Sequence, residues 1–295
     1  MTCRMTQTGS MEQASTDVDA IIPVYRERPE AIRATLEALL AQEHALSKIY
    51  LVDDGSPNPV SVPDDLLATQ RICLTRLQKN AGVSAARNLG IGKSKARFLV
   101  CVDSEILLAK NWVAACCSHF ASHPQAGVVY TRMIPDRPER LLTRWRMRFQ
   151  ENRFPVASGK VPFAPGHALM FRREAIERIG GFNVHMRCDE DSDVCFRIGH
   201  AGWETHFVAE SECLSIQPDT IPVLASKDLT RSNWESPDDY SLSLFILLRT
   251  RASLERLGRN LVKLRLTFLP IDLAVWAMSI KMAISRAIRS RPQKT

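Results

Sequence analysis

The chain has 295 residues, of which 45% are hydrophobic and 24% are charged, and its formal net charge is +7. This composition excludes an intrinsically disordered chain, and the length predicts one catalytic domain with an appendage. The eight cysteines show no CxxC spacing, and the first residues form neither a basic nor an apolar signal segment. These features predict a reduced, cytoplasmic protein in which the thiols are mostly small buried hydrophobes.

The positive charge is concentrated in the C-terminal part of the chain. From Arg249 onward there are eleven Lys and Arg residues against Glu255 and Asp272, so the preceding part is slightly negative. Because Leu, Phe, Trp and Ile alternate with these cations, an anionic lipid surface is a better-matched partner than nucleic acid. The most apolar stretch, "LTFLPIDLAVWAMSI", is interrupted by Pro and Asp and falls short of the ~18 apolar residues of a membrane span.

Strand-like and helix-like segments alternate in the first half of the chain, after a polar leader at residues 1–17. Predicted strands lie in "DAIIPVY", "KIYLV", "ICLTRLQ", "RFLVCV" and "AGVVYTRMI". Predicted helices lie in "RPEAIRATLEALLAQ", "GVSAARNLGIGKSKA" and "NWVAACCSHFASH". This alternation predicts an α/β fold with a mostly parallel central sheet flanked by helices.

The second half departs from strict alternation. Residues 134–162 are Arg-rich and spaced for an amphipathic helix, "HALMFRREAIERIGGF" predicts a strand, a helix and a Gly-Gly stop, and "DEDSDVCFRIGHAGW" predicts a helix with an acidic first turn. We expect a catalytic domain over 18–222 and a helical, basic extension over 223–295. The extension is expected to bind the inner face of the cell membrane peripherally, although a helical cap on the catalytic domain and an oligomer contact are alternatives.

Acidic residues follow two predicted strands, as Asp53–Asp54 and as Asp103 and Glu105. Ligands of open α/β sheets bind beyond the carboxyl ends of the strands, so these acids are expected in a ligand crevice. Oxygen ligands two residues apart on an extended segment point to one side, which suits a divalent cation such as Mg²⁺. Solvated strand ends are the alternative interpretation.

A third acidic group, "CDEDSDVC", contains Asp189, Glu190, Asp191 and Asp193 at a predicted helix start. Acids there stabilise a helix by ~0.3–1 kcal/mol each through its dipole, but capping accounts for one or two acids rather than four. Like charges at short range raise one another's pKa, which favours a general base.

Six motifs in order carry a family resemblance: "AIIPVYRERPEAIRATLEALLAQ", "LVDDGS", "NAGVSAARNLGI", "FLVCVDSEI", "GHALMFRREAIERIGGF" and "EDSDVCFRIGHAGW". Over residues 18–217 the chain resembles a family 2 glycosyltransferase of the GT-A fold. The resemblance implies an inverting, metal-dependent hexosyltransferase that uses a nucleotide-diphosphate sugar, expected to be a UDP-sugar, with Mg²⁺ or Mn²⁺. The implied acceptor is a hydroxyl of a glycan or a lipid-linked molecule, in synthesis of an envelope glycan, a polysaccharide or a glycolipid.

The resemblance also implies roles for individual residues. Asp54 would bind the ring N–H of the base, Asp103 would contact ribose and metal, and Glu105 occupies the position of a second metal ligand. Asp191 would be the general base, supported by Glu190. The implied nucleotide-sugar pocket further includes Pro23, Tyr25, Glu27, Asp53, Arg87 and Asn88.

Two departures from the family pattern weaken the implied metal site. Glu105 replaces the usual Asp, which lengthens the ligand by ~1.3–1.5 Å. Ser215 or Gln217 stands where many members carry a His. An alternative is therefore a catalytically impaired GT-A domain that binds nucleotide or glycan, and a third is a nucleotidyltransferase, although no Gly-rich, Lys-bearing phosphate loop follows the first strand.

Three further candidates lie outside these motifs. An Arg row is expected either to contact the acceptor or to form a solvated amphipathic face, and it comprises Arg140, Arg144, Arg146, Arg148 and Arg153. His167 falls where the family approaches the donor or acceptor sugar, with a structural role as the alternative. Trp203 is expected to pack against the sheet, with a sugar platform as the alternative.

Overall fold

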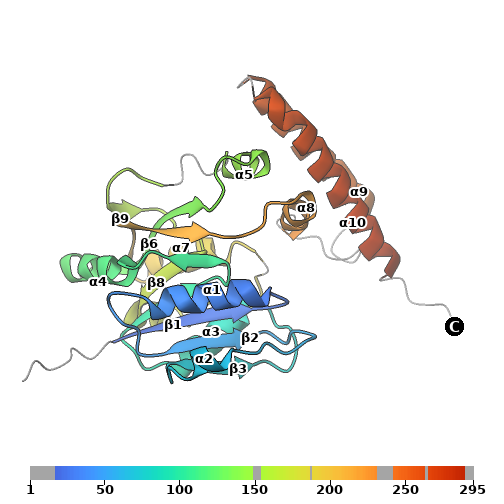
Figure 1. Cartoon of the computed structure of the whole chain (residues 1–295). Helices are drawn as coiled ribbons and strands as arrows, with labels where there is room; N and C mark the ends of the chain where they lie inside the picture. The colour runs from blue at the N-terminus through green and yellow to red at the C-terminus, as the bar shows by residue number, and fades with distance from the viewer. Residues whose placement is uncertain (1–16, 149–153, 187, 231–241, 263–264, 290–295) are drawn as a thin grey trace, which may run out of the picture.

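The computed structural model describes residues 17–148, 154–186, 188–230, 242–262 and 265–289. The predicted leader therefore lies outside the described residues, apart from its last position. Within the described part, nine strands form one sheet in the order β3-β2-β1-β4-β8-β6-β9-β5, with β7 beside β9. Figure 1 shows this sheet with helices on both faces and two long helices projecting from one end.

The first half of the sheet is parallel, as the sequence predicts. It contains β1 (Val18–Val24), β2 (Ile49–Asp53), β3 (Ile72–Arg76) and β4 (Phe98–Val102), with β1 between β2 and β4. The connecting helices are α1 (Pro29–Leu40), the short α2 (Asp64–Leu67) and α3 (Val83–Lys93). The chain reverses its strand order between β1 and β4, which places the topological switch point there.

The second half of the sheet is mixed. Strand β8 (Ala168–Arg172) runs antiparallel between β4 and β6 (Ala126–Pro135), and β9 (Glu204–Ser215) runs parallel to β6. Two strands of three residues each, β5 (Ile106–Leu108) and β7 (Gly159–Val161), pair antiparallel with β9. Six of the nine described strands thus share one direction, which confirms the predicted mostly parallel sheet.

Two hydrophobic clusters cover the two faces of the sheet. On one face pack α1 and α4 (Trp112–Ser122), through residues such as Leu36 and Trp112. On the other face pack α3, α6 (Arg173–Arg178) and α7 (Glu190–His200), through residues such as Ala86, Ile176 and Val194. Four of the seven described cysteines are buried and all seven are free, in agreement with the predicted reduced thiols.

The C-terminal part is helical, as predicted. Helices α8 (Ile221–Thr230), α9 (Leu242–Val262) and α10 (Leu269–Arg289), with the 3₁₀ turn Leu266–Phe268, pack together beside the short α5 (Leu141–Met147). Helix α5 confirms part of the amphipathic helix predicted over 134–162. Helix α8 begins before residue 223, so it crosses the predicted domain boundary.

A buried polar network joins α10 to α5. The Asp272 side chain is completely buried and accepts hydrogen bonds from the indole N–H of Trp145 (3.0 Å), the guanidinium of Arg148 (2.6 Å) and the amide of Asn260. The Asp that interrupts the apolar stretch therefore has a packing role. The segment Leu266–Ile288 is long and apolar enough to cross a membrane by length and composition alone, and 33% of its most apolar window is buried in the protein.

Candidate active site

A cleft of about 530 Å³ opens at the carboxyl ends of β1, β2 and β4, at the switch point in strand order. Many of the residues implied by the resemblance line this cleft: Pro23, Tyr25, Glu27, Asp54, Asp103, Glu105 and Asp191. Asp53, Arg87, Asn88 and Glu190 do not line it. The topology thus brings together acids that are distant in the sequence, such as Asp54 and Asp191, which are 137 positions apart.

The turn after β1 places two residues in the wall of the cleft. Arg26 adopts a left-handed conformation with φ 58°, its N–H donates to the Ser56 hydroxyl at 3.0 Å, and its guanidinium lies 5.0 Å from the centre of the Tyr25 ring. Non-Gly residues in this conformation are uncommon and concentrate at functional sites. The turn places Tyr25 and Glu27, on either side of Arg26, in the cleft wall.

Asp54 holds the loop that precedes α3. Its carboxylate accepts hydrogen bonds from the Asn80 side chain (2.8 Å) and from the N–H groups of Ala81 (2.7 Å) and Gly82 (2.9 Å). An ionised carboxylate offers about four acceptor sites. Asp54 therefore retains acceptor capacity for a ligand N–H at the edge of the cleft.

Asp53 faces away from the cleft and stabilises the loop after β2. It is 1% exposed and accepts from the N–H groups of Ser56 (2.9 Å) and Val60 (3.3 Å) and from Arg76 (3.1 Å). Burial opposes ionisation of Asp53, but these hydrogen bonds and the Arg76 charge hold its pKa below the ordinary value.

A buried arginine on α3 links the metal motif to α7. Arg87 is 2% exposed, and its guanidinium donates to Asp103 Oδ1 and to Glu190 Oε1, each at 2.9 Å. Burial disfavours the charged guanidinium, but the two carboxylates outweigh it and raise the pKa of Arg87. Arg87 therefore fixes the end of β4 relative to the start of α7.

Asn88 lies on the other side of α3. Its side-chain amide both donates to and accepts from the peptide groups of Phe182, each at 2.8 Å. Gly181 has φ 80°, and a Cβ there would lie 2.5 Å from Asn88 Oδ1. In this structure Asn88 holds the Gly-Gly stop after α6 and is not brought into the cleft.

Three side chains of the acidic cluster at the start of α7 have different partners. Asp191 reaches the cleft, where Oδ2 accepts from the Gly166 N–H (2.7 Å) and Oδ1 from the Ser192 N–H (2.8 Å). Glu190 pairs with Arg87, and Asp193 pairs with Arg197 at 2.6 Å. A Cβ on Gly166 would lie 3.0 Å from the Asp191 Cβ, so glycine allows this close approach.

Three carboxylates in the cleft act on one another electrostatically. The pKa of Glu27 is raised, first by burial and then by the charges of Glu105 and Asp103. Three hard oxygen donors that repel one another match the chemistry of a divalent Mg²⁺ or Mn²⁺ site. Glu105, whose side chain is 22% exposed, also accepts from Arg28 at 3.2 Å.

Two cationic side chains also line the cleft. Lys227, on α8, donates to Gln217 Oε1 at 2.5 Å, and its charge acts on both Glu27 and Asp103. Arg146, on α5, pairs with Asp219 at 2.6 Å. Sequence reasoning placed Arg146 in the Arg row but missed Lys227, because no local motif links α8 to the strand ends.

The other candidates divide between cleft and core. His167 lines the cleft, burial lowers its pKa to about 4, and its Nε2 has no hydrogen-bond partner among the described residues. Ser215 and Gln217, at the position of the missing His, also line the cleft. Trp203 packs against Gly127. In the Arg row, Arg148 is buried against Trp145, whereas Arg140 and Arg144 are exposed. Arg153 lies outside the described residues.

The chain matches a known protein family. Residues 19–180 match the model described as Glycosyl transferase family 2. A pre-mycofactocin glycosyltransferase of Mycobacterium tuberculosis is 28% identical over 193 residues, which cover 63% of this chain and 40% of that protein. An N-acetylglucosaminyltransferase of Sinorhizobium fredii is 26% identical over 269 residues, which cover 84% of this chain and 64% of that protein. The chain thus spans less than two thirds of either relative.

A solved structure shares the fold. A mannosyltransferase from Pyrobaculum calidifontis, determined in complex with GDP-Man and Mn²⁺, superimposes with a TM-score of 0.55 at 18% sequence identity. The match covers 95% of this chain and 76% of that one. The likeness therefore extends beyond the sheet into the C-terminal helices.

Proposed function

This chain belongs to glycosyl transferase family 2, and from that membership we propose that it transfers a sugar from a nucleotide-diphosphate donor to a hydroxyl acceptor with inversion. One observation carries the proposal: Asp103 and Asp191 line the same cleft, and Arg87 with Glu190 fixes the distance between the elements that bear them. The glycosyltransferase relatives support a transferase, and the donor and acceptor are our inference.

Asp191 is the proposed general base. It removes the proton of the acceptor hydroxyl as the acceptor oxygen forms a bond to the anomeric carbon, and the bond from that carbon to the nucleoside diphosphate breaks in the same step. Attack from the face opposite the leaving group inverts the anomeric centre. The Gly166 and Ser192 N–H groups hold the Asp191 carboxylate in position, and Glu190 supports it through Arg87.

Asp103 and Glu105, with Glu27 beside them, are the proposed holders of Mg²⁺ or Mn²⁺. When bound, such a cation neutralises charge that develops on the leaving diphosphate. Lys227 and Arg146 add fixed positive charge to the cleft, where they stabilise the same leaving group. The Mn²⁺ in the Pyrobaculum calidifontis mannosyltransferase supports a divalent metal.

The nucleotide is proposed to lie between the end of β1 and Asp54. Pro23 and Tyr25 offer an apolar wall, and the remaining acceptor capacity of Asp54 suits a base N–H. A UDP-sugar is the proposed donor, and the N-acetylglucosaminyltransferase relative makes UDP-N-acetylglucosamine the first to test. Asp53 and Asn88 are proposed to act indirectly, because they hold loops beside the cleft.

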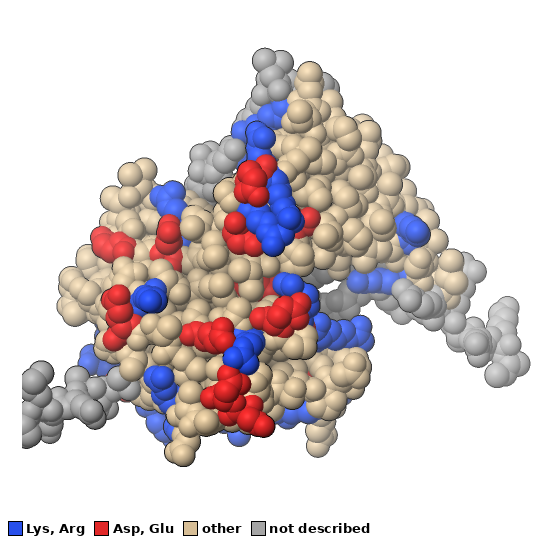
Figure 2. All heavy atoms as spheres, viewed as in Figure 1, with Lys and Arg blue, Asp and Glu red and all other residues tan. Residues whose placement is uncertain are grey.

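The helical extension is proposed to bring the enzyme to an anionic membrane surface on the cytoplasmic side. Figure 2 shows a broad face over α10 with Lys and Arg confined mainly to its margins. Exposed apolar side chains on the extension include Leu247 (65%), Leu254 (62%) and Ile288 (65%). An apolar face bordered by cations suits interfacial binding, and an envelope glycan or lipid-linked acceptor fits that location. Flotation with anionic liposomes tests this, and protein that stays at the bottom at low salt contradicts it.

A binding module without catalysis is the second candidate. It is favoured by the engagement of Glu105 with Arg28 and by Ser215 and Gln217 in place of the usual His. The family match leaves no support for a nucleotidyltransferase.

A panel of nucleotide sugars separates the two candidates. We expect one donor to raise the unfolding temperature in the presence of Mn²⁺ or Mg²⁺ and to be turned over slowly. Asp191→Asn should retain that stabilisation but lose turnover by ~10²–10⁴-fold, the usual contribution of a general base. Asp103→Ala and Glu105→Ala should lose metal-dependent turnover. Stabilisation without turnover, even with acceptor extracts, would favour the binding module, and unchanged metal-dependent turnover in the two Ala variants would refute the metal assignment.

A further inference from the structure

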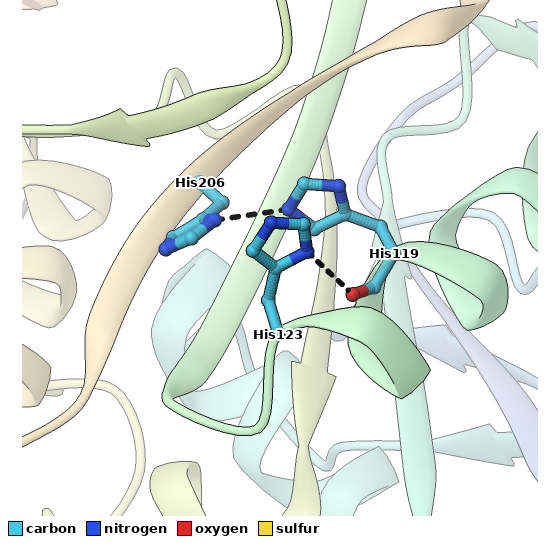
Figure 3. Close-up of side chains that lie close together, drawn as sticks. All are labelled: His119, His123 and His206. Atoms are coloured by element: carbon cyan, nitrogen blue, oxygen red, sulfur yellow. Dashed lines mark hydrogen bonds between the residues drawn. The ribbon is translucent and has the colours of Figure 1, made fainter.

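Three histidines converge at the edge of the sheet opposite the cleft. His119 and His123 lie at the C-terminal end of α4, and His206 lies near the start of β9, whereas the cleft lies at the other ends of the strands. Figure 3 shows the three rings facing one another, with one nitrogen of His123 directed at the hydrogen bond between the other two. His119 and His206 are buried, and His123 is exposed, so the group can be reached from solvent.

The spacing of the ring nitrogens suits a tetrahedral metal ion. His119 Nε2 and His206 Nδ1 are 2.9 Å apart, and one nitrogen from each of the three rings lies within 4.8 Å of the others. At Zn–N distances of about 2.0–2.1 Å, a tetrahedral site separates its ligand nitrogens by about 3.3 Å. The His119–His206 separation is shorter than that value, and the rings of His119 and His123 are stacked with their centres 4.0 Å apart. The three nitrogens are therefore close enough for reorientation of the rings to bring them to a common ion.

The nitrogens that face away from this centre already have orienting partners. His206 Nε2 lies 2.9 Å from Glu204 Oε2, and Glu204 is in turn held by Lys160 at 2.8 Å. His123 Nδ1 lies 3.0 Å from the carbonyl oxygen of His119. Metal-binding imidazoles almost always donate their second N–H to a carboxylate or a backbone carbonyl, and here two of three do so.

The electrostatic surroundings of the three histidine rings favour a bound cation. The C-terminal end of α4 contributes partial negative charge, and the nearby carboxylate of Glu210 acts on His119 in the same sense.

We propose that His119, His123 and His206 form a binding site for a divalent transition metal, with Zn²⁺ as the best match to three imidazoles. Imidazole is a preferred ligand of Zn²⁺, and three histidines leave a fourth position for water. The ion would join the end of α4 to the start of β9. This site is independent of the proposed transferase chemistry, since it shares no residue with the cleft.

Zinc titration of the metal-free full chain tests the proposal, with a chromophoric chelator as competitor. We expect one Zn²⁺ to bind outside the cleft, to raise the unfolding temperature, and to be replaceable by Co²⁺ with the visible spectrum of a tetrahedral centre. His123→Ala removes an exposed ligand and should abolish this binding without unfolding the protein. Glu204→Gln should weaken it by about 10–100-fold, as is usual for a partner that orients a ligand.

His200→Ala is the matched control. His200 also ends a helix and places its Nδ1 3.0 Å from the carbonyl oxygen four residues earlier, but among the residues that the structure describes it belongs to no such group of three. Zinc binding unchanged in His123→Ala, or equally weakened in His200→Ala, would overturn the proposal. So would zinc binding that disappears in Asp103→Asn instead, because the ion would then occupy the cleft.

Discussion

Two buried arginines join segments that are distant in sequence, one beside the cleft and one at the base of the helical extension. Arg87 is 2% exposed and bridges Asp103 on one side and Glu190 on the other. Arg148 is 8% exposed and pairs with Asp272, which also accepts from Trp145 and Asn260. Both arrangements replace the water around a guanidinium with carboxylates.

The two arrangements differ in the surroundings of their carboxylates, Asp103 and Asp272. The side chain of Asp103 is 46% exposed and faces the cleft, whereas that of Asp272 is 0% exposed and faces protein on all sides. Asp103 can therefore exchange partners with a ligand, and Asp272 cannot do so without unpacking α10. The same type of ion pair thus positions a reactive site in one region and fastens a structural element in the other.

The largest effect on stability is expected from Asp272→Ala. Removal of this carboxylate leaves the Arg148 charge buried without its main counterion, which costs about 3–5 kcal/mol of unfolding free energy. Urea unfolding measures the loss. Glu255→Ala is the control from the same extension, because its pair with Arg251 is exposed and such pairs contribute about 0–1 kcal/mol. Equal losses in the two variants would contradict a fastening role for Asp272.

Acid pH should weaken the cleft region through His167. Its pKa is lowered to about 4 in the folded protein against about 6.5 in the unfolded chain, so unfolding takes up a proton between these values. The contribution of neutral His167 to the free energy of unfolding is fully present above about pH 6.5 and is lost as the pH falls toward 4. The loss is at most about 3 kcal/mol. The difference between urea midpoints at about pH 7 and about pH 5 should shrink in His167→Asn but not in His185→Asn, which alters an exposed histidine.

Lysine substitutions of the two arginines compare the regions directly. Arg87→Lys keeps the charge but loses the two-armed bridge, so Asp103 and α7 shift and turnover should fall by about 100-fold. Arg148→Lys should lower the unfolding temperature while turnover stays within a few-fold of the parent. Donor turnover and thermal unfolding are measured for both. If the two variants lose turnover equally, the proposed division between a positioning and a fastening arginine is wrong.

The smallest effect concerns an exposed pair at the mouth of the cleft. Arg28→Ala removes the partner of Glu105 and frees its carboxylate for a cation, so Mn²⁺ should activate at up to about fivefold lower concentration. Arg33→Ala, on the helix that follows Arg28 and paired with Asp65 and Glu37, is the control and should leave activation unchanged. Weaker activation in Arg28→Ala would mean that Arg28 itself contacts the donor.

The parallel half of the sheet could be predicted because each of its strands is a short apolar run that ends at an acid or a turn. The acids at those ends follow from topology, and Asp54, Asp103 and Asp191 do line one cleft. The three-residue strands β5 and β7 could not be predicted, since so short a segment shows no period and is held by pairing with β9.

The remaining site features depend on contacts between distant segments. Lys227 reaches the cleft because α8 packs on α10 and α5, and no local pattern reports that packing. The pairing of Arg87 with Glu190 spans 103 positions, and the His119–His206 contact spans 87. Such pairs have no fixed spacing, so a single sequence identifies the residue types without identifying their partners.

Helix α8 has a consequence for how this enzyme can be altered. It begins at Ile221, within the predicted catalytic domain, and carries Lys227 from the extension into the cleft. A chimera that exchanges everything after residue 222 with a relative would therefore change the cleft together with the proposed membrane-binding surface. The two properties therefore cannot be exchanged separately, and a chimera that preserves catalysis has to retain α8 together with the sheet.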